Sequence, residues 1–390
     1  MSRDEAFSAL SAVLTAFINS TDAMKATTTT TSPTLTHSLM PCQWTKSPEL
    51  EASIKSFQTQ SDGLAGSCTK LSLVDLASMP DAGLQSLFDE ILKISHGLIA
   101  TVMTLFSMSL SRPLFDEVHR LAKAELTQVL QLVGDIQTQK FDTCKAAVGQ
   151  VWEMNELIQK LPLTNKVAYK RALMAVGSVV KDTHREFKEA RDESIELNRK
   201  KTLNDGEVDN QDEEEGIDSC MDEDWGVMNE DGDDDGFTPE EMPYVDAALS
   251  IMEKSFTTVK VSMEMMTIMS EQSIPSTVFS VDKDGSFSGM QAIQEWVATV
   301  FILNKKFSTS VTDLGMELYA PLCLDTLKAQ YDIAYDAITQ VSSKFLEAHK
   351  MCKEMNYLSA ESEERLQRLL NGTEGFISHI ELEKMCFAQI

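Results

Sequence analysis

The chain has 390 residues, of which 61 are Asp or Glu and 34 are Lys or Arg, so its formal net charge is -27. A protein that binds nucleic acid by neutralising phosphates needs a basic surface, and this composition argues against direct nucleic-acid binding. Ten prolines and 17 glycines are few for this length while Met is frequent at 21, and this combination favours long helices over a sheet-rich fold.

The N-terminal block predicts six helices separated by loops and helix-stop residues. A start signal lies at Ser47-Pro48-Glu49, and Pro113 opens the fourth helix, whose apolar residues recur every three or four positions. In the sixth helix we expect Ala168, Ala172, Ala175 and Val179 to face inward. The expected ranges are about 4–20, from 47 onward, 81–109, 113–136, 141–160 and 165–201.

One apolar stretch has the length of a short membrane span. Residues 94–111 contain no Lys, Arg, Asp or Glu, which reaches the minimum for a bilayer-crossing helix. Small and polar residues recur along it at helical spacing, however, and leave one polar stripe beside a broad apolar face. We therefore expect an inner helix of a bundle, and no association with a membrane.

An acid run divides the chain in its middle. Between Asp205 and Glu241 there are 18 acidic residues and no Lys or Arg, so this segment cannot bury enough apolar surface to offset its ordering entropy. The sequence therefore predicts three parts: a helical bundle over 1–203, a disordered acidic linker over 204–242, and a second helical bundle over 243–390. Both bundles are expected to be antiparallel and of up-down topology.

Two long apolar seams dominate the C-terminal block. One runs from Val245 to Met266 and the other from Leu324 to Cys352, with alternating gaps of three and four residues. Such a seam can pair with a partner's helix or pack inside its own bundle. A second apolar row widens the first seam beyond a coiled-coil stripe, which favours packing inside the bundle.

The rest of this block is expected to contain three further helices. One covers about 291–307, a short one covers 312–319, and Ser359 caps the last, which has a possible break at Asn371-Gly372.

No catalytic arrangement is present in the sequence. It lacks the glycine-rich nucleotide loops, the GxSxG elbow and HExxH, and its six histidines are scattered. Asp116 and His119 are the nearest approach to a di-iron motif, which needs two Glu-x-x-His pairs. We predict no enzyme, no cofactor, and no catalytic, cofactor-binding or metal-ligating residue; the partner-binding residues and the oligomeric state stay open.

An EF-hand-like pattern lies in the acid run. Asp231, Asp233, Asp235 and Gly236 match the first half of a calcium loop, but position twelve is Met242 where the bidentate glutamate belongs. Loose attraction of counterions is the interpretation that we favour over specific calcium binding.

Several motifs resemble, in order, the cyclin-D-binding protein family, also described as maternal Id-like proteins. They are Val151-Trp152, Asn165-Lys166, the stretch Val179–His184, the acid run, Asp313-Leu314, and the stretch Leu318–Cys323. The resemblance covers most of the chain from about residue 80. Ala320 departs from it, because the first of two prolines is expected at this position.

The resemblance implies an all-helical, non-enzymatic regulator in cytoplasm and nucleus, with bundles like those of talin and vinculin. Such a protein would bind D-type cyclins and helix-loop-helix factors and would restrain cell-cycle progression and transcription without binding DNA. The alternative is a vinculin-like or talin-like structural adaptor that links cytoskeletal or adhesion proteins.

Overall fold

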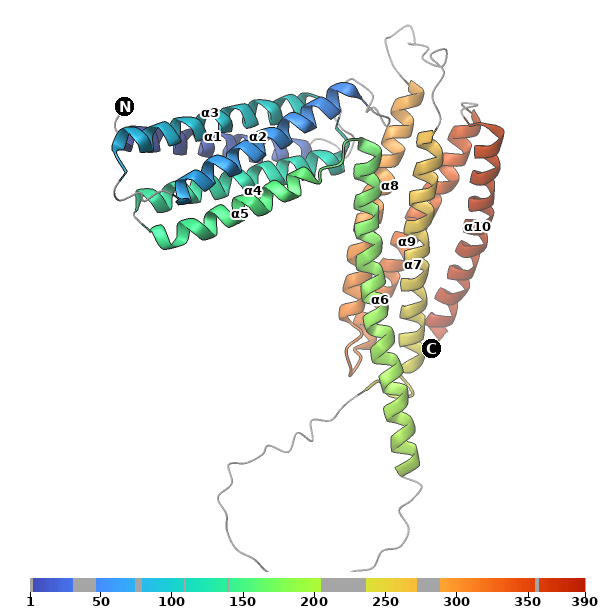
Figure 1. Ribbon diagram of the computed structural model, residues 1–390. Coiled ribbons are helices and arrows are strands. Elements are labelled where there is room, and N and C mark those ends of the chain that lie inside the picture. Colours follow the sequence, from blue (N-terminus) through green and yellow to red (C-terminus); the bar gives the residue numbers. More distant parts are fainter. Residues whose placement is uncertain are drawn as a thin grey trace, which may run out of the picture. The chain divides into compact units, whose positions relative to one another are not determined.

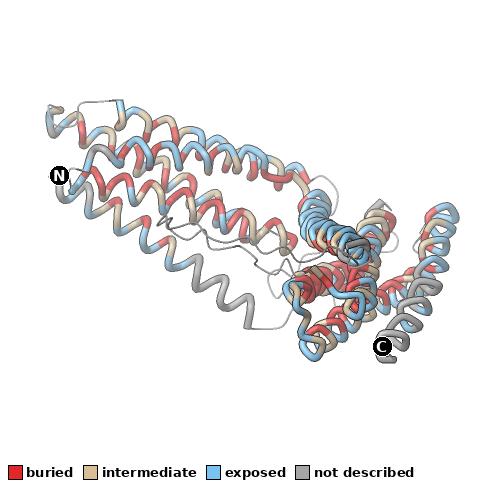
Figure 2. The backbone as a smooth tube through the Cα atoms, turned by 90° about the horizontal axis from the view of Figure 1, so that it is seen from below, coloured by how far each residue is buried: buried red, intermediate tan, exposed pale blue. Residues whose placement is uncertain are grey.

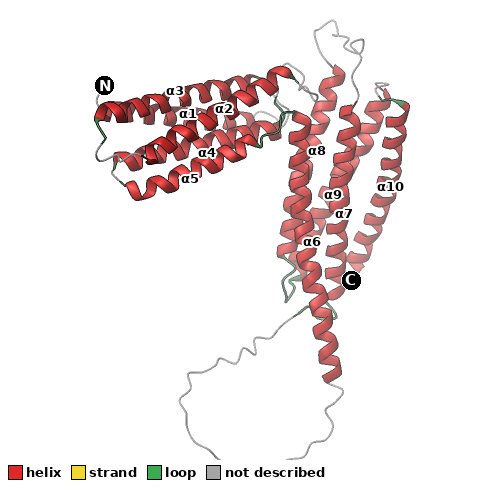
Figure 3. Cartoon of the chain, viewed as in Figure 1, coloured by secondary structure: helices red, strands yellow, loops and turns green. Residues whose placement is uncertain are grey.

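The computed structural model describes residues 3–30, 47–73, 79–108, 110–138, 140–204, 236–271, 288–354 and 358–389. These residues form ten α-helices and no strand, so the predicted all-α class is confirmed (Figure 3). In chain order the helices are α1 (Arg3–Thr30), α2 (Pro48–Leu73), α3 (Asp81–Ser107), α4 (Arg112–Gln137), α5 (Phe141–Gln159), α6 (Asn165–Asn204), α7 (Met242–Glu271), α8 (Ser288–Met316), α9 (Leu324–Glu354) and α10 (Ala360–Gln389).

The chain divides into two compact units, each described here by itself. The first contains 1–172 and 269–301, and the second contains 173–268 and 302–390. This division differs from the predicted blocks, because most of α6 groups with α7 in the second unit. The acid run separates these helices in sequence, yet Arg191 Nε of α6 donates to Asp246 Oδ1 of α7 at 2.5 Å.

In the first unit α1 to α5 lie side by side as a bundle (Figure 1). Neighbours around it follow the order α1, α3, α2, α5, α4, and α4 returns to α1. Helices α2 and α3 are antiparallel, because Ser56 hydrogen-bonds Thr101 and Ser67 donates to Glu90. The apolar residues that recur every three or four positions along α4 are buried, as their spacing predicts: Leu114, Val118, Ala122, Leu126, Val129, Val133 and Ile136.

Of the inward face predicted for α6, Ala168 is buried and Ala172 is half-buried, but the prediction is wrong at Ala175 and Val179. Ala175 and Val179 are exposed, whereas Tyr169, Leu173, Val176, Val180 and Phe187 are buried. The two sets lie on neighbouring faces of the helix, and the set with larger side chains removes more apolar surface from water. The orientation of α6 therefore follows the face with the larger apolar side chains, and the spacing of its alanines does not predict it.

In the second unit the first seam packs inside the unit, as predicted. Along α7 the residues Val245, Met252 and Val259 are buried, and so are Ala248 and Ile251 of the second row. The α9 seam is buried from Leu327 to Cys352. Both seams are therefore occupied within the second unit. Figure 2 shows that buried and exposed positions alternate along the helices of the chain.

Helix α8 corrects the prediction of two separate helices over 291–307 and 312–319. It continues through 308–311, where hydroxyl groups donate to the carbonyl one turn earlier: Thr309 to Lys305, Ser310 to Lys306 and Thr312 to Ser308. In this geometry Ser and Thr stay inside a helix and do not cap it.

Helix α10 begins where Ser359 was expected to cap it, since Ser359 Oγ accepts the Ser362 N–H at 3.2 Å. It does not break at Asn371-Gly372, and Gln367 Nε2 donates to Asn371 Oδ1 at 2.8 Å one turn along the helix.

Part of the predicted linker belongs to the second unit. Residues 205–235 lie outside the described residues, but Phe237 is buried and donates its N–H to Ser194 Oγ of α6. Thr238 and Glu241 form a capping box before α7, in which each side chain accepts the other's N–H. Glu241 also accepts the N–H of Leu322, which ties the start of α7 to the loop before α9.

The tight approach of α8 to α6 yields a stability prediction. A Cβ at Gly315 would lie 2.7 Å from Thr183 Cγ2 and 2.8 Å from the Phe187 ring, whereas a Cβ at Gly149 of α5 meets nothing within 4 Å. Gly315→Ala should lower stability by about 1–3 kcal/mol through overpacking, and Gly149→Ala should raise it by roughly 0.5–1 kcal/mol. Scanning calorimetry checks both; a higher unfolding temperature for Gly315→Ala would contradict the contact.

Candidate functional site

A polar cluster lies inside the apolar core of the first unit. Ser61 of α2, Glu125 of α4 and Asn155 of α5 are all buried, and Glu125 is 0 % exposed. Ser61 Oγ lies 2.6 Å from Glu125 Oε1 and 2.9 Å from Asn155 Oδ1. Asn155 Nδ2 in turn donates to Asp62 Oδ1 at 3.4 Å, so the cluster reaches from the core to an exposed carboxylate.

The geometry of this cluster indicates a neutral Glu125. Ser61 has one hydroxyl hydrogen and cannot donate to both neighbouring oxygens. If Glu125 carries a proton, it donates to Ser61 Oγ and Ser61 donates to Asn155 Oδ1, which satisfies both contacts. Burial raises the pKa of Glu125 from 4.5 to about 7, although the Ser61 hydrogen bond opposes this shift.

Glu125 also affects a neighbouring thiol. Burial, and then the charge of Glu125, raise the pKa of Cys68 to about 12. This cysteine is therefore a protonated, buried thiol and not a nucleophile. The cluster therefore contains a carboxyl whose ionisation affects the stability of the bundle. The neighbouring thiol of Cys68 is not a nucleophile that could take part in covalent chemistry.

The sequence contains an indication of this cluster, because two polar residues occupy positions within apolar rows. Glu125 follows Leu121 by four positions and precedes Val129 by four, so it falls in an apolar row of α4. Asn155 follows Val151 in α5 in the same way. A charged or amide side chain at a core position is the informative exception, because it needs a buried partner.

A second feature is an exposed, partly apolar face of α6 in the second unit. Met174 is 57 % exposed and Val179 is 46 % exposed, and five positions along the helix separate them by about 140° around its axis. The exposed Ala175, Ser178 and Asp182 lie between them on this side of the helix. This face therefore combines exposed apolar side chains with a polar centre, and the adjacent Lys181 and Asp182 carry opposite charges.

Exposed apolar residues also lie at the end of α8 and just after it, near α6. Tyr319 is 61 % exposed, packs edge-on against Phe187 at 5.3 Å and donates its hydroxyl to Glu186 Oε1 at 3.2 Å. The neighbouring Met316 is also exposed. Tyr319 of the 318–323 motif thus contacts Glu186 and Phe187, which follow the 179–184 motif in α6. These residues, far apart in sequence, form one corner of the second unit.

Part of the chain matches a known protein family. Residues 56–193 match the family described as Grap2 and cyclin-D-interacting, N-terminal. The match covers less than half of the chain, and over this stretch the chain is similar to that family. The resemblance inferred from the sequence is confirmed there, and a comparison with curated proteins found no match.

The matched stretch of the Grap2 and cyclin-D-interacting family contains both features. The cluster of Ser61, Glu125 and Asn155 lies within it, and so does the apolar face with Met174 and Val179. The Tyr319 corner lies beyond its end. The family stretch therefore supplies one side of that corner, through α6.

The other residues considered for chemistry have structural partners. His119 is buried and stacks on Phe106 and Phe115 with ring centroids 6.4 Å apart, and Asp116 pairs with Arg112. Asp231, Asp233 and Asp235 lie outside the described residues, while Gly236 lies against Ser194 of α6. Within the described ranges, no three His, Cys, Asp or Glu side chains gather where they could hold a metal ion.

In the described part of the chain, one helical segment, Ala82–Ser107 in α3, is long and apolar enough to cross a membrane by length and composition alone. Core helices of bundles pass the same test. Here Leu98, Val102 and Leu105 are buried against the other helices of the first unit.

The raised pKa of Glu125 predicts a pH dependence of stability. Between pH 4.5 and about 7 the folded chain binds more protons than the unfolded chain, so this group's contribution to stability falls as pH rises through that window. Glu125→Gln removes the cost, and the variant should be more stable than the parent at pH 8 by up to about 3 kcal/mol, at roughly 1.4 kcal/mol per pKa unit. The two should be nearly equal at pH 5.

Denaturant unfolding at both pH values measures the difference. Glu90→Gln is the control, because hydrogen bonds from Lys70 and Ser67 lower the pKa of Glu90. This variant should lose stability at pH 8, and the loss should disappear in acid. A constant difference between Glu125→Gln and the parent across the range would contradict a neutral Glu125.

Proposed function

We propose that this protein is a non-enzymatic regulator that binds D-type cyclins and helix-loop-helix factors, and that it restrains cell-cycle progression and transcription. It acts in cytoplasm and nucleus by sequestering these partners without contacting DNA. The family match over 56–193 supports the cyclin part, since cyclin-D interaction stands in the description of that family. The helix-loop-helix partners, the locations and the regulatory direction rest on the sequence resemblance.

The exposed apolar face of α6 carries this proposal. Met174 is a large apolar side chain that remains exposed to solvent, although other apolar residues of α6 are buried. Exposed apolar residues that gather on one face mark interaction sites. This face lies in the stretch that the family shares, whereas both C-terminal seams are occupied within the second unit.

Charge defines the chemistry of the surface that fits this face. In the second unit, α6 residues 173–181 and α8 residues 302–312 contain Lys181, Lys305 and Lys306 and no Asp or Glu. Both segments therefore carry a positive charge within a chain whose net charge is -27. A partner surface with apolar side chains and acidic neighbours would therefore bind here with complementary charge.

A double substitution on α6 tests the cyclin-binding face. Met174→Glu with Val179→Glu places two acids on it and retains good helix formers, so the fold is kept while apolar contact is lost. Affinity for a purified D-type cyclin should fall at least tenfold by calorimetry. Ile333→Glu with Leu346→Glu is the matched control, because both side chains are exposed on α9.

An equal loss of affinity in the α9 control, or unchanged affinity in the α6 variant, contradicts this assignment. Recovery of actin or adhesion proteins in place of cyclin and helix-loop-helix factors would instead favour the structural adaptor.

Helix-loop-helix factors pose a different problem, since they hold DNA with two basic arms. A partner that occupies their pairing helices without supplying a second arm leaves an assembly with weak DNA affinity. The acid run contributes 16 Asp and Glu between residues 205 and 235 and would attract the remaining arm.

Neutralising the acid run tests this attraction. Exchanging the Asp and Glu of 205–235 for Asn and Gln leaves Gly236–Glu241 intact, which is necessary because Phe237 and Glu241 hold the second unit together. The association rate with a helix-loop-helix factor should fall several-fold at low salt and match the parent at high salt. A rate with unchanged salt dependence would remove the acid run from the mechanism.

A further inference from the structure

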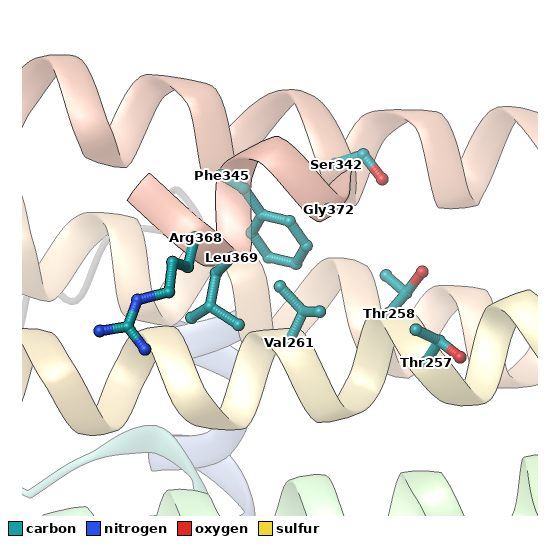
Figure 4. A pocket seen from close by; sticks show the side chains of 8 residues that line it. All are labelled: Thr257, Thr258, Val261, Ser342, Phe345, Arg368, Leu369 and Gly372. Carbon is teal, nitrogen blue, oxygen red and sulfur yellow. The ribbon is translucent and has the colours of Figure 1, made fainter. Parts of the chain in front are cut away.

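The second unit contains a pocket that the proposed regulator function does not use. It has a volume of ≈ 200 Å³ and lies between α7, α9 and α10 (Figure 4). Its lining residues are Thr257, Thr258, Val261, Ser342, Phe345, Arg368, Leu369 and Gly372.

The body of this pocket is apolar. Val261, Phe345 and Leu369 provide aliphatic and aromatic walls, and Figure 4 shows them grouped at its centre. Thr257 and Thr258 bring hydroxyls, but these donate to the carbonyls of Glu253 and Lys254 one turn earlier. Both threonine hydroxyls have therefore used their proton, and toward an occupant they can only accept a hydrogen bond.

Two polar groups remain available to an occupant. Ser342 is 0 % exposed, and its Oγ has no hydrogen-bond partner among the described residues. A buried hydroxyl without a partner carries a free-energy cost that a ligand would remove. Arg368 lies toward the other end of the pocket in Figure 4 and pairs at 3.0 Å with Glu364, where both side chains are more than two thirds exposed. Such an exposed pair is weak, so its guanidinium can turn to an anion.

A glycine keeps this space open. A Cβ added at Gly372 would meet nothing within 4 Å, although the residue lies in the middle of α10. Glycine is unfavourable within a helix and no contact requires it here. Its place on the pocket wall therefore makes room for an occupant.

We propose that this pocket binds a small aromatic monocarboxylic acid with a hydroxyl at its far end. The carboxylate pairs with Arg368, the ring packs against Phe345, Val261 and Leu369, and the hydroxyl reaches Ser342. The size agrees, because benzene occupies a protein cavity of about 150 Å³ and this pocket holds a ring with a short side chain.

Calorimetry and ligand-observed NMR with 3-(4-hydroxyphenyl)propionate test the proposal on the full chain. For a ligand of this size we expect saturable one-site binding with Kd of roughly 0.1–1 mM. Gly372→Leu fills the pocket and should weaken binding at least tenfold. Gly372→Ala shares the gain in helix propensity but adds one methyl, and it should bind within about threefold of the parent.

Two further variants assign the polar groups. Arg368→Gln should weaken the hydroxy acid and 3-phenylpropionate alike, by roughly tenfold. Ser342→Ala should weaken the hydroxy acid and leave 3-phenylpropionate unchanged, because only the hydroxyl loses a partner. Unfolding temperatures of all variants show that the fold is intact.

The absence of saturable binding up to 5 mM would overturn the proposal, and so would a folded Gly372→Leu variant that binds as the parent does. If Gly372→Leu leaves no effect on the acids but abolishes capture of a protein partner, the pocket receives a partner side chain and the small-molecule assignment fails.

Discussion

The burial of broad apolar helix faces is the constraint on which the rest of this structure depends. Without strands in the described part, each helix must cover its apolar stripe against other helices. In α7 this stripe is two rows wide, and both Val245 and Ile251 are fully enclosed. Helix α6 can bury one of its two apolar faces, and it buries the one with Leu173 and Val180. The face with Val179 remains exposed.

Polar side chains are buried at several places inside this apolar frame, and some of them pair with one another, as in the Ser61–Glu125–Asn155 cluster. Burial of the Glu125 carboxyl in this cluster raises its pKa to about 7. Glu241 instead uses two N–H groups to hold α7 to the loop before α9. We propose that these carboxyls serve the architecture and that exposed apolar residues near lysines serve recognition.

The sequence predicts those features that local periodicity or capping determines. The α4 core positions, the Ser47 and Ser359 helix starts and the α9 seam follow from spacing alone. The orientation of α6 does not, because two apolar faces compete and the neighbouring helices decide. The joined helix α8 depends on hydroxyl-to-carbonyl bonds that compete with capping, and the space beside Gly372 depends on three helices at once. The burial of Glu125 could have been predicted from the sequence, because this charged residue lies within an apolar row of α4.

We propose that α6 carries recognition, and hydrogen–deuterium exchange on the complex with a D-type cyclin tests that proposal most directly. Backbone amides of 173–181 should exchange at least several-fold more slowly in the complex, because a docked partner suppresses helix opening. Amides of the buried α9 seam should be unchanged. A stable complex whose protection falls elsewhere and leaves 173–181 as fast as in the free protein would contradict the account.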